Sequence, residues 1–233
     1  MKKLDVTDKL IRELIEEVAP LVSGLTKWNL AIRSLGVRVL PKDRGYEEVL
    51  LGQLRGAGIN IDEDEPRSLM ERLTEYVVEA NVLGAYQSST QELLIIRENV
   101  DESNLNGLKL VVAHELVHRG QHVNFAHLFD RLDNTTREVY YYLLQEGASL
   151  GEAMRKIDKV KQLMTVIESH AYYVQQLLQK SHFPDAKIES HFNFATLLMK
   201  LFGQEKISQY TEGIPQVKAA VASGDIDSLY RNL

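Results

Sequence analysis

His114-Glu-Leu-Val-His118 is the stretch that decides the fold, because it sets two histidines and a glutamate on one predicted helix. Residues four apart on an α-helix are offset by about 40° and rise by about 6 Å, so both imidazoles can reach one ion at about 2.0 to 2.1 Å. The Glu115 carboxylate then reaches a water on the metal instead of the metal itself. Zinc lowers the pKa of that water to about 7. The stretch predicts zinc ligands at His114 and His118 and a general base at Glu115.

The residues before this motif argue against an ordinary helix with two surface histidines. Val111-Val112-Ala113 make the helix apolar enough to be buried. Isolated buried histidine and glutamate side chains are costly unless they have partners. A metal ion would partner both types of side chain.

The residues after the motif restrict the class of metal site. A metzincin has glycine and histidine three and six residues after its second histidine, where this chain has Gln121 and Asn124, so that class is excluded. His122 lies one turn beyond His118, but three successive turns of one straight helix cannot surround a tetrahedral ion. We expect His122 to be a polar residue near the helix end, with Gly120 nearby.

A third ligand is expected downstream. The helical segment 157–179 has an apolar stripe, and Glu168 lies beside that stripe instead of opposite it. A carboxylate held against an apolar face needs a partner, which a zinc ion supplies, although an exposed or salt-bridged glutamate fits the periodicity equally well. The competing candidates are His170, His191, Glu146 and Glu189.

Apolar periodicity predicts an α+β, mostly helical chain. In the first half we expect a helix at 7–22 that Thr7 caps. The motif helix is expected to start around Leu108 and to end near Gly120. The other elements expected are strands at 36–40, 80–86 and 92–96, and helices at 46–54, 66–79, 134–144, 150–179, 188–202 and after 213. We expect a single domain over 1–233, with a small mixed sheet and the motif helix in a front α/β lobe (about 1–122) and a helical back lobe (about 123–233).

Composition limits the possible partners. The 233 residues are 44% hydrophobic and carry a net charge of −6, with acidic and basic residues interspersed. No basic stripe is available for nucleic acid or an anionic membrane. The absence of cysteine excludes thiol catalysis and cysteine-ligated zinc. Without a long apolar run or a signal-like N-terminus, we expect a cytoplasmic protein; the sequence leaves the oligomeric state open.

Three segments resemble a family of zincin-like proteins whose name associates it with deazaflavin-coenzyme biosynthesis. They are His114-Glu-Leu-Val-His-Arg-Gly-Gln121, Leu163-Met-Thr-Val-Ile-Glu-Ser-His-Ala-Tyr-Tyr-Val174 and Lys206-Ile-Ser-Gln-Tyr-Thr-Glu-Gly213. The resemblance covers roughly residues 80–230 and implies a glutamate zincin with Glu168 as third ligand. The hairpin before the motif resembles the zincin lobe whose edge strand binds substrate by strand addition. The family's pattern at Lys206, Gln209, Tyr210 and Gly213 suggests a packing role.

One position departs from the glutamate zincins. These proteins often have an aspartate four residues after the ligand glutamate, where it orients a ligand histidine, but this chain has Tyr172. The orienting group must come from elsewhere, and losing such a group can cost 10- to 100-fold in affinity or activity. The candidates for stabilising the oxyanion in the transition state are Tyr172, Tyr173, His170 and His191.

These observations predict a zinc-dependent hydrolase, a metallopeptidase that aligns a peptide or protein substrate along residues 80–86. Imidazole and carboxylate also accept iron, nickel and cobalt. The alternative is a non-catalytic, zinc-containing regulatory or interaction protein, for which Tyr172 is the argument. Glu115 favours catalysis, because a structural zinc has no use for a base.

Overall fold

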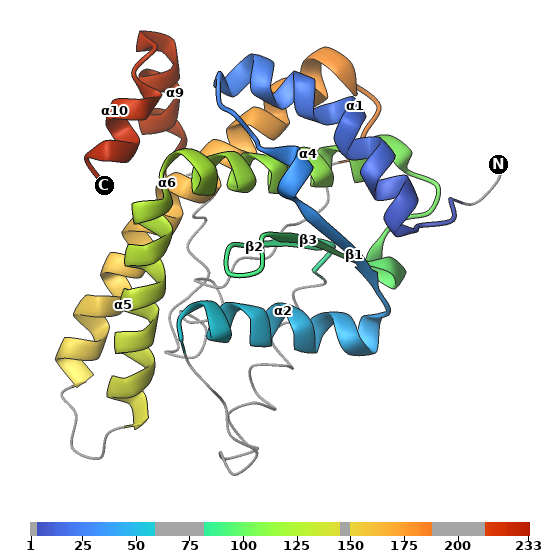
Figure 1. Ribbon diagram of the computed structural model, residues 1–233. Coiled ribbons are helices and arrows are strands. Elements are labelled where there is room, and N and C mark those ends of the chain that lie inside the picture. Colours follow the sequence, from blue (N-terminus) through green and yellow to red (C-terminus); the bar gives the residue numbers. More distant parts are fainter. Residues whose placement is uncertain (1–3, 59–81, 145–149, 188–212) are drawn as a thin grey trace.

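The computed structural model describes residues 4–58, 82–144, 150–187 and 213–233. In these residues the chain is α+β and mostly helical, as the sequence predicts, with helices packed around one small sheet (Figure 1). The helices predicted at 66–79 and 188–202 lie outside the described residues. None of the described helices combines the length and the hydropathy needed to cross a membrane.

The sheet is mixed and has the order β1-β3-β2. Its strands are β1 (Gly36–Leu40), β2 (Gly84–Gln87) and β3 (Glu92–Ile96), so the boundaries predicted for β1 and β3 are confirmed. β3 pairs with β1 in parallel and with β2 in antiparallel orientation. The predicted strand 80–86 begins later, at Gly84, and its first two residues lie outside the described part. Within the described sheet β2 is an edge strand.

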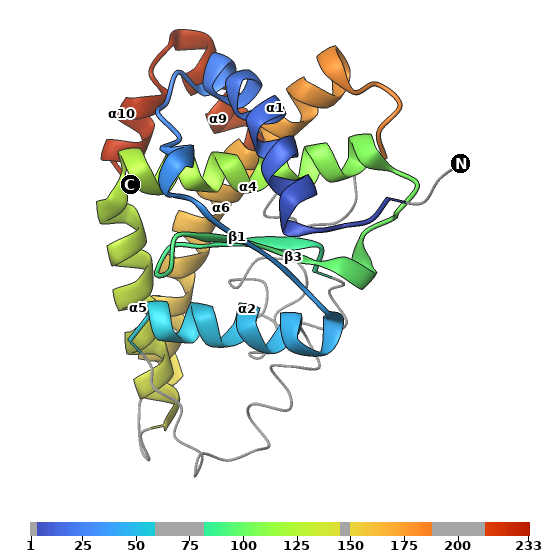
Figure 2. The same ribbon diagram turned by 45° about the vertical axis from the view of Figure 1, so that its right-hand side comes forward.

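Two helices cover opposite faces of this sheet. In Figures 1 and 2, α4 (Leu105–Asn124) lies on one face and α2 (Lys42–Gly56) on the other. α1 (Asp8–Thr26) packs over α4 and is capped as predicted, since the Thr7 side chain accepts a hydrogen bond from the Leu10 N–H at 3.3 Å. The motif helix therefore lies between α1 and the sheet.

The burial of α4 on all sides follows from its sequence. The Asn104 side chain caps its start by accepting from the Gly107 N–H at 2.8 Å. Every residue from Leu110 to Val117 is buried, including His114 and Glu115 of the motif, and His118 is partly buried. A helix that is apolar all round packs in the interior. The helix continues past Gly120 to Asn124. Glycine at position 120 serves packing, because a Cβ there would lie 2.8 Å from Leu30 Cδ2.

The second half of the chain is helical. α5 (Ala126–Leu144) starts earlier than the predicted 134 and packs along α6 (Leu150–His182), which crosses α4. α9 (Ile214–Ser223) and α10 (Ile226–Arg231) follow Gly213, as predicted, and α9 packs on α6. The crossing of α4 and α6 places two distant segments of sequence in contact beside β2.

Candidate metal centre

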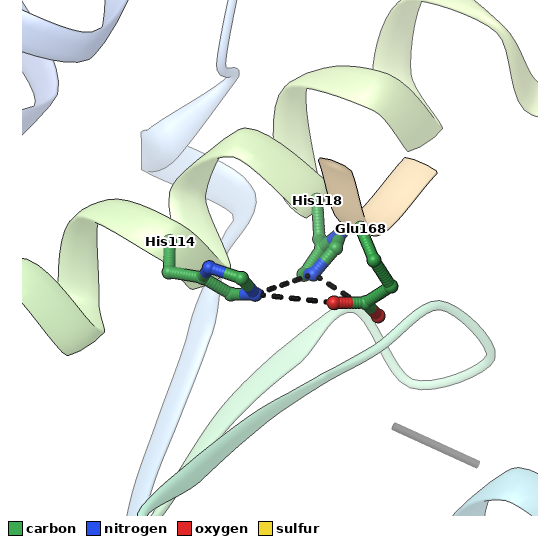
Figure 3. Close-up of side chains that lie close together, drawn as sticks. All are labelled: His114, His118 and Glu168. Atoms are coloured by element: carbon green, nitrogen blue, oxygen red, sulfur yellow. Dashed lines mark hydrogen bonds and ion pairs between the residues drawn. The ribbon is translucent and has the colours of Figure 1, made fainter. Parts of the chain in front are cut away.

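The structure brings the three predicted ligands together. His114 and His118 project from α4, and Glu168 projects toward them from α6 (Figure 3). His114 Nε2 lies 3.4 Å from Glu168 Oε2, and His118 Nε2 lies 3.6 Å from Glu168 Oε1. One ligand atom of each residue lies within 4.8 Å of the others, and His114 and Glu168 are buried. The group could hold a metal ion.

The donor set fits zinc. The Nε2 atoms of the two imidazoles are only 3.1 Å apart, and both face the Glu168 carboxylate. A metal ion bound between these three side chains would accept a lone pair from each of them. Two imidazoles and a carboxylate are the ligands of one type of catalytic zinc site, which keeps a fourth position for water.

The electrostatics of the group also favour a cation. Burial by itself would raise the pKa of Glu168, but the nearby His118 and His114 imidazoles lower it below its usual range. Burial would lower the pKa of His118, but the charge and hydrogen bonding of Glu168 outweigh burial and raise it. Glu168 is therefore ionised and supplies the negative charge that favours a metal ion, and a metal ion that binds there displaces the proton from His118.

Glu115 lies beside the ligand group and is not part of it. Its Oε2 accepts a hydrogen bond from the Tyr86 N–H at 2.8 Å, and the residue is buried. In an antiparallel pair only every second residue exchanges hydrogen bonds with the neighbouring strand. Leu83 is such a residue, because its carbonyl accepts from the Ile96 N–H, so Gly84 and Tyr86 are not. Tyr86 thus turns its N–H away from β3, and the edge of the sheet holds the predicted base.

A residue that sequence reasoning missed orients one ligand. His118 Nδ1 lies 2.7 Å from Gln121 Oε1, and Gln121 Nε2 donates to the Ile167 carbonyl at 2.9 Å and to the Tyr230 hydroxyl at 2.7 Å. The contact orients the His118 imidazole from position 121 instead of position 172. The signal was the i, i+3 spacing from His118, which puts both side chains on one helix face.

The candidate oxyanion stabilisers are dispersed. His170 is buried, with Nδ1 3.0 Å from the Tyr230 hydroxyl, and burial lowers its pKa to about 3. Tyr172 and Tyr173 are half-buried on α6, and the Lys218 ammonium lies 5.8 Å from the centre of the Tyr173 ring. His191 lies outside the described residues.

The remaining candidates have other surroundings. His122 is not in the ligand group; its Nδ1 lies 2.7 Å from the Tyr86 hydroxyl, and burial lowers its pKa. Gly213 fits the expected packing role, because a Cβ there would lie 2.5 Å from Ser169 Oγ on α6. The other predicted positions lie outside the described residues: Glu146, Glu189, Lys206, Gln209 and Tyr210.

Comparison with known proteins supports the fold. No protein-family model matches the chain, and no curated protein matches it. A solved structure from Chloroflexus aurantiacus, described as a "putative hydrolase with a novel fold", is similar with a TM-score of 0.58. The match covers 96% of this chain and 81% of that one at 16% identity. At this identity the likeness shows the fold alone.

Proposed function

We propose that this chain is a zinc-dependent hydrolase of the glutamate-zincin type that cleaves peptide bonds. The observation that carries the proposal is the convergence of Glu168 on His114 and His118, with the Glu115 carboxylate beside the group and outside it. The buried Glu115 carboxylate beside the three predicted ligands favours a catalytic site, because such a carboxylate can act as a general base. The description of the Chloroflexus protein as a hydrolase agrees with this class of activity.

The roles of the residues follow from their positions. His114, His118 and Glu168 would hold zinc, which supplies an acidified water and polarises the substrate carbonyl. The Tyr86 N–H donates to Oε2 of Glu115. The other oxygen, Oε1, would be left to accept the proton of the acidified water. Glu115 then passes this proton to the leaving amine. Gln121 keeps His118 oriented throughout.

Substrate would bind along β2. A peptide that adds to an edge strand gains main-chain hydrogen bonds without demanding a particular sequence. β2 is an edge strand in the described sheet, and its Tyr86 N–H already reaches the base. Gly84, however, serves packing: a Cβ there would lie 3.0 Å from Ile95 Cδ1 and 3.2 Å from Val111 Cγ1. Replacing Gly84 is therefore a poor probe of peptide binding, because it would disturb the contact between β2 and α4.

The non-catalytic alternative loses its main support. It rested on Tyr172, which stands where many glutamate zincins orient a ligand histidine through an aspartate. Gln121 offers His118 an acceptor at 2.7 Å, so the orienting interaction does not depend on position 172. This observation favours the hydrolase.

Metal analysis combined with one substitution tests the proposal. We expect one zinc per chain, and we expect Glu115→Gln to keep that zinc while losing about 10²-fold or more of the activity on a peptide library, the scale of a lost general base. Glu13→Gln, an exposed change on α1, is the matched control and should keep full activity. Equal activity in Glu115→Gln, absence of zinc, or absence of activity in every protein would contradict the proposal.

A further inference from the structure

The C-terminal helix α10 reaches the metal centre through one side chain. Tyr230 is fully buried, and its hydroxyl lies 2.7 Å from Gln121 Nε2 and 3.0 Å from His170 Nδ1. Gln121 in turn contacts His118 at 2.7 Å. A continuous chain of hydrogen bonds therefore connects α10 to a predicted zinc ligand.

The partners of Gln121 fix which way its amide points. The Ile167 carbonyl can only accept, so the amide nitrogen must face it, at 2.9 Å. The amide oxygen then faces His118 Nδ1, and that nitrogen must carry the hydrogen. This leaves His118 Nε2, the atom that faces Glu168, to offer its lone pair to a metal.

Tyr230 strengthens the same orientation. Its hydroxyl accepts from the second N–H of Gln121 and forms a hydrogen bond with His170 Nδ1. Burial raises the pKa of the Tyr230 phenol, so the hydroxyl keeps its proton. Turning the Gln121 amide over would place its oxygen against the Ile167 carbonyl and remove the N–H from which the Tyr230 hydroxyl accepts.

The packing of α10 holds Tyr230 in place. The Tyr230 ring stacks on Phe125, with centroids 4.9 Å apart and an interplanar angle of 19°, and meets Trp28 edge-on at 5.4 Å. Trp28 Nε1 also donates to Asp227 Oδ1 at 2.9 Å, which ties α10 to the segment after α1. These contacts with Phe125 and Trp28 fix the Tyr230 ring, and with it the position of the hydroxyl beside Gln121.

We propose that α10 is a positioning element of the metal centre: Tyr230, with the Ile167 carbonyl, holds the Gln121 amide so that His118 presents Nε2 to the metal. This inference rests on the zinc site of the proposed function. It assigns a role to a residue that lies more than 100 positions from Gln121 in sequence.

Three variants test the role. Gln121→Leu removes the acceptor from His118, and zinc affinity measured by chelator competition should fall 10- to 100-fold. Tyr230→Phe keeps the aromatic packing and the Ile167 contact, so we expect a smaller, severalfold loss. The control is Gln175→Leu, the same change at a buried glutamine of α6 that donates to the Leu110 carbonyl. It should leave zinc affinity unchanged.

A second readout separates positioning from general loss of structure. In ¹⁵N-edited spectra of the zinc-loaded protein, the proton on His118 Nδ1 should be observed in wild type and in Gln175→Leu, and should shift or exchange faster in Gln121→Leu and Tyr230→Phe. Unchanged affinity and spectra in both site variants would overturn the positioning role alone, as would an equal loss in Gln175→Leu. A wild-type protein that does not bind zinc would overturn the proposed function as well.

Discussion

Two buried polar clusters lie next to each other on α4, and they differ in how their charges are satisfied. Arg119 is 3% exposed, and the described residues offer it no carboxylate. All five of its N–H groups nevertheless have neutral acceptors, namely the Leu30 and Ala31 carbonyls, the Tyr86 and Ser34 hydroxyls and the Gln91 side-chain oxygen. His118, the residue before it, faces His114 and Glu168 at 3.1 to 3.6 Å.

The difference separates a structural cluster from a ligand site. Around Arg119 every donor meets an acceptor, so the cluster is complete without any further group. In the His114, His118 and Glu168 group, two imidazoles and a carboxylate converge with their ligand atoms within 4.8 Å of one another, so the three could hold a metal ion. A buried polar cluster is thus informative about function when its side chains converge as a set of metal ligands instead of pairing donor with acceptor.

Removing the Arg119 guanidinium should have the largest effect on the free energy of unfolding, because it disrupts the whole hydrogen-bonded cluster around that side chain. Arg119→Met leaves buried acceptors such as the Leu30 carbonyl without a donor, and each costs about 1–3 kcal/mol. We expect the free energy of unfolding of the metal-free protein to fall by roughly 3 kcal/mol or more, as measured by urea denaturation. Arg119→Lys should recover only part of this, because an ammonium cannot reproduce the planar fork. Unchanged stability in Arg119→Met would contradict the assignment.

Removing a ligand should affect the other cluster only when metal is present. Zinc at a hundredfold excess over its Kd should stabilise wild type by about 2.7 kcal/mol, and His114→Ala should lose this gain. Thermal unfolding with and without a chelator measures both values. His127→Ala, a change at an exposed histidine of α5, should keep the full zinc effect. If zinc stabilised His114→Ala as much as wild type, the metal would bind elsewhere.

Adding a methyl group at Gly120, beside Arg119, should have an intermediate effect on the free energy of unfolding. Gly120→Ala places a Cβ 2.8 Å from Leu30 Cδ2, and overpacking costs about 1–3 kcal/mol, partly offset by the better helix propensity of alanine. We expect a net loss of about 1 kcal/mol in urea denaturation. At Gly24 of α1 a Cβ meets nothing within 4 Å, so Gly24→Ala should instead stabilise by up to about 1 kcal/mol. The opposite signs of the two changes form the test.

Asp133, a partly buried carboxyl on α5, offers a third case. Burial, followed by the charge of Asp130, raises its pKa from 3.8 to about 6. The folded state then binds more protons than the unfolded state between these pH values, so this carboxyl costs stability as the pH rises through 6. Asp133→Asn should therefore stabilise the protein above pH 6, by less than the roughly 1.4 kcal/mol per pKa unit of a fully buried group. Below pH 4 the variant and wild type should unfold alike.

Local patterns in the sequence predicted much of the fold and the ligand group. β1 follows from alternation, β3 follows from the polar hairpin loop before it, and His114 and His118 follow from helical spacing. Glu168 needed both its place beside an apolar stripe and a family resemblance. These signals all lie within a few residues of the position they describe.

Other features depend on contacts between distant segments and left no local signal. The Gln121 amide takes its orientation from Tyr230, which joins it only in the folded chain. α5 begins at Ala126, ahead of the predicted start, because Leu128 and Phe129 are buried by tertiary packing amid polar neighbours. Arg119 has the sequence character of a surface charge, and its neutral acceptors come from two distant parts of the chain, the segment 30–34 and the β2–β3 hairpin.

The parallel pairing of β1 with β3 has a consequence for the order in which the chain folds. β2 and β3 are consecutive and form a hairpin, whereas Gly36 of β1 pairs with Glu92 only after the whole intervening chain has been made. α1 is tied to β1 through Asp8 Oδ1, which accepts from the Val39 N–H at 2.7 Å. Non-local pairing is slow because the loop must close before the contacts form. During synthesis from the N-terminus, β1 is therefore the first strand made and the last to be paired.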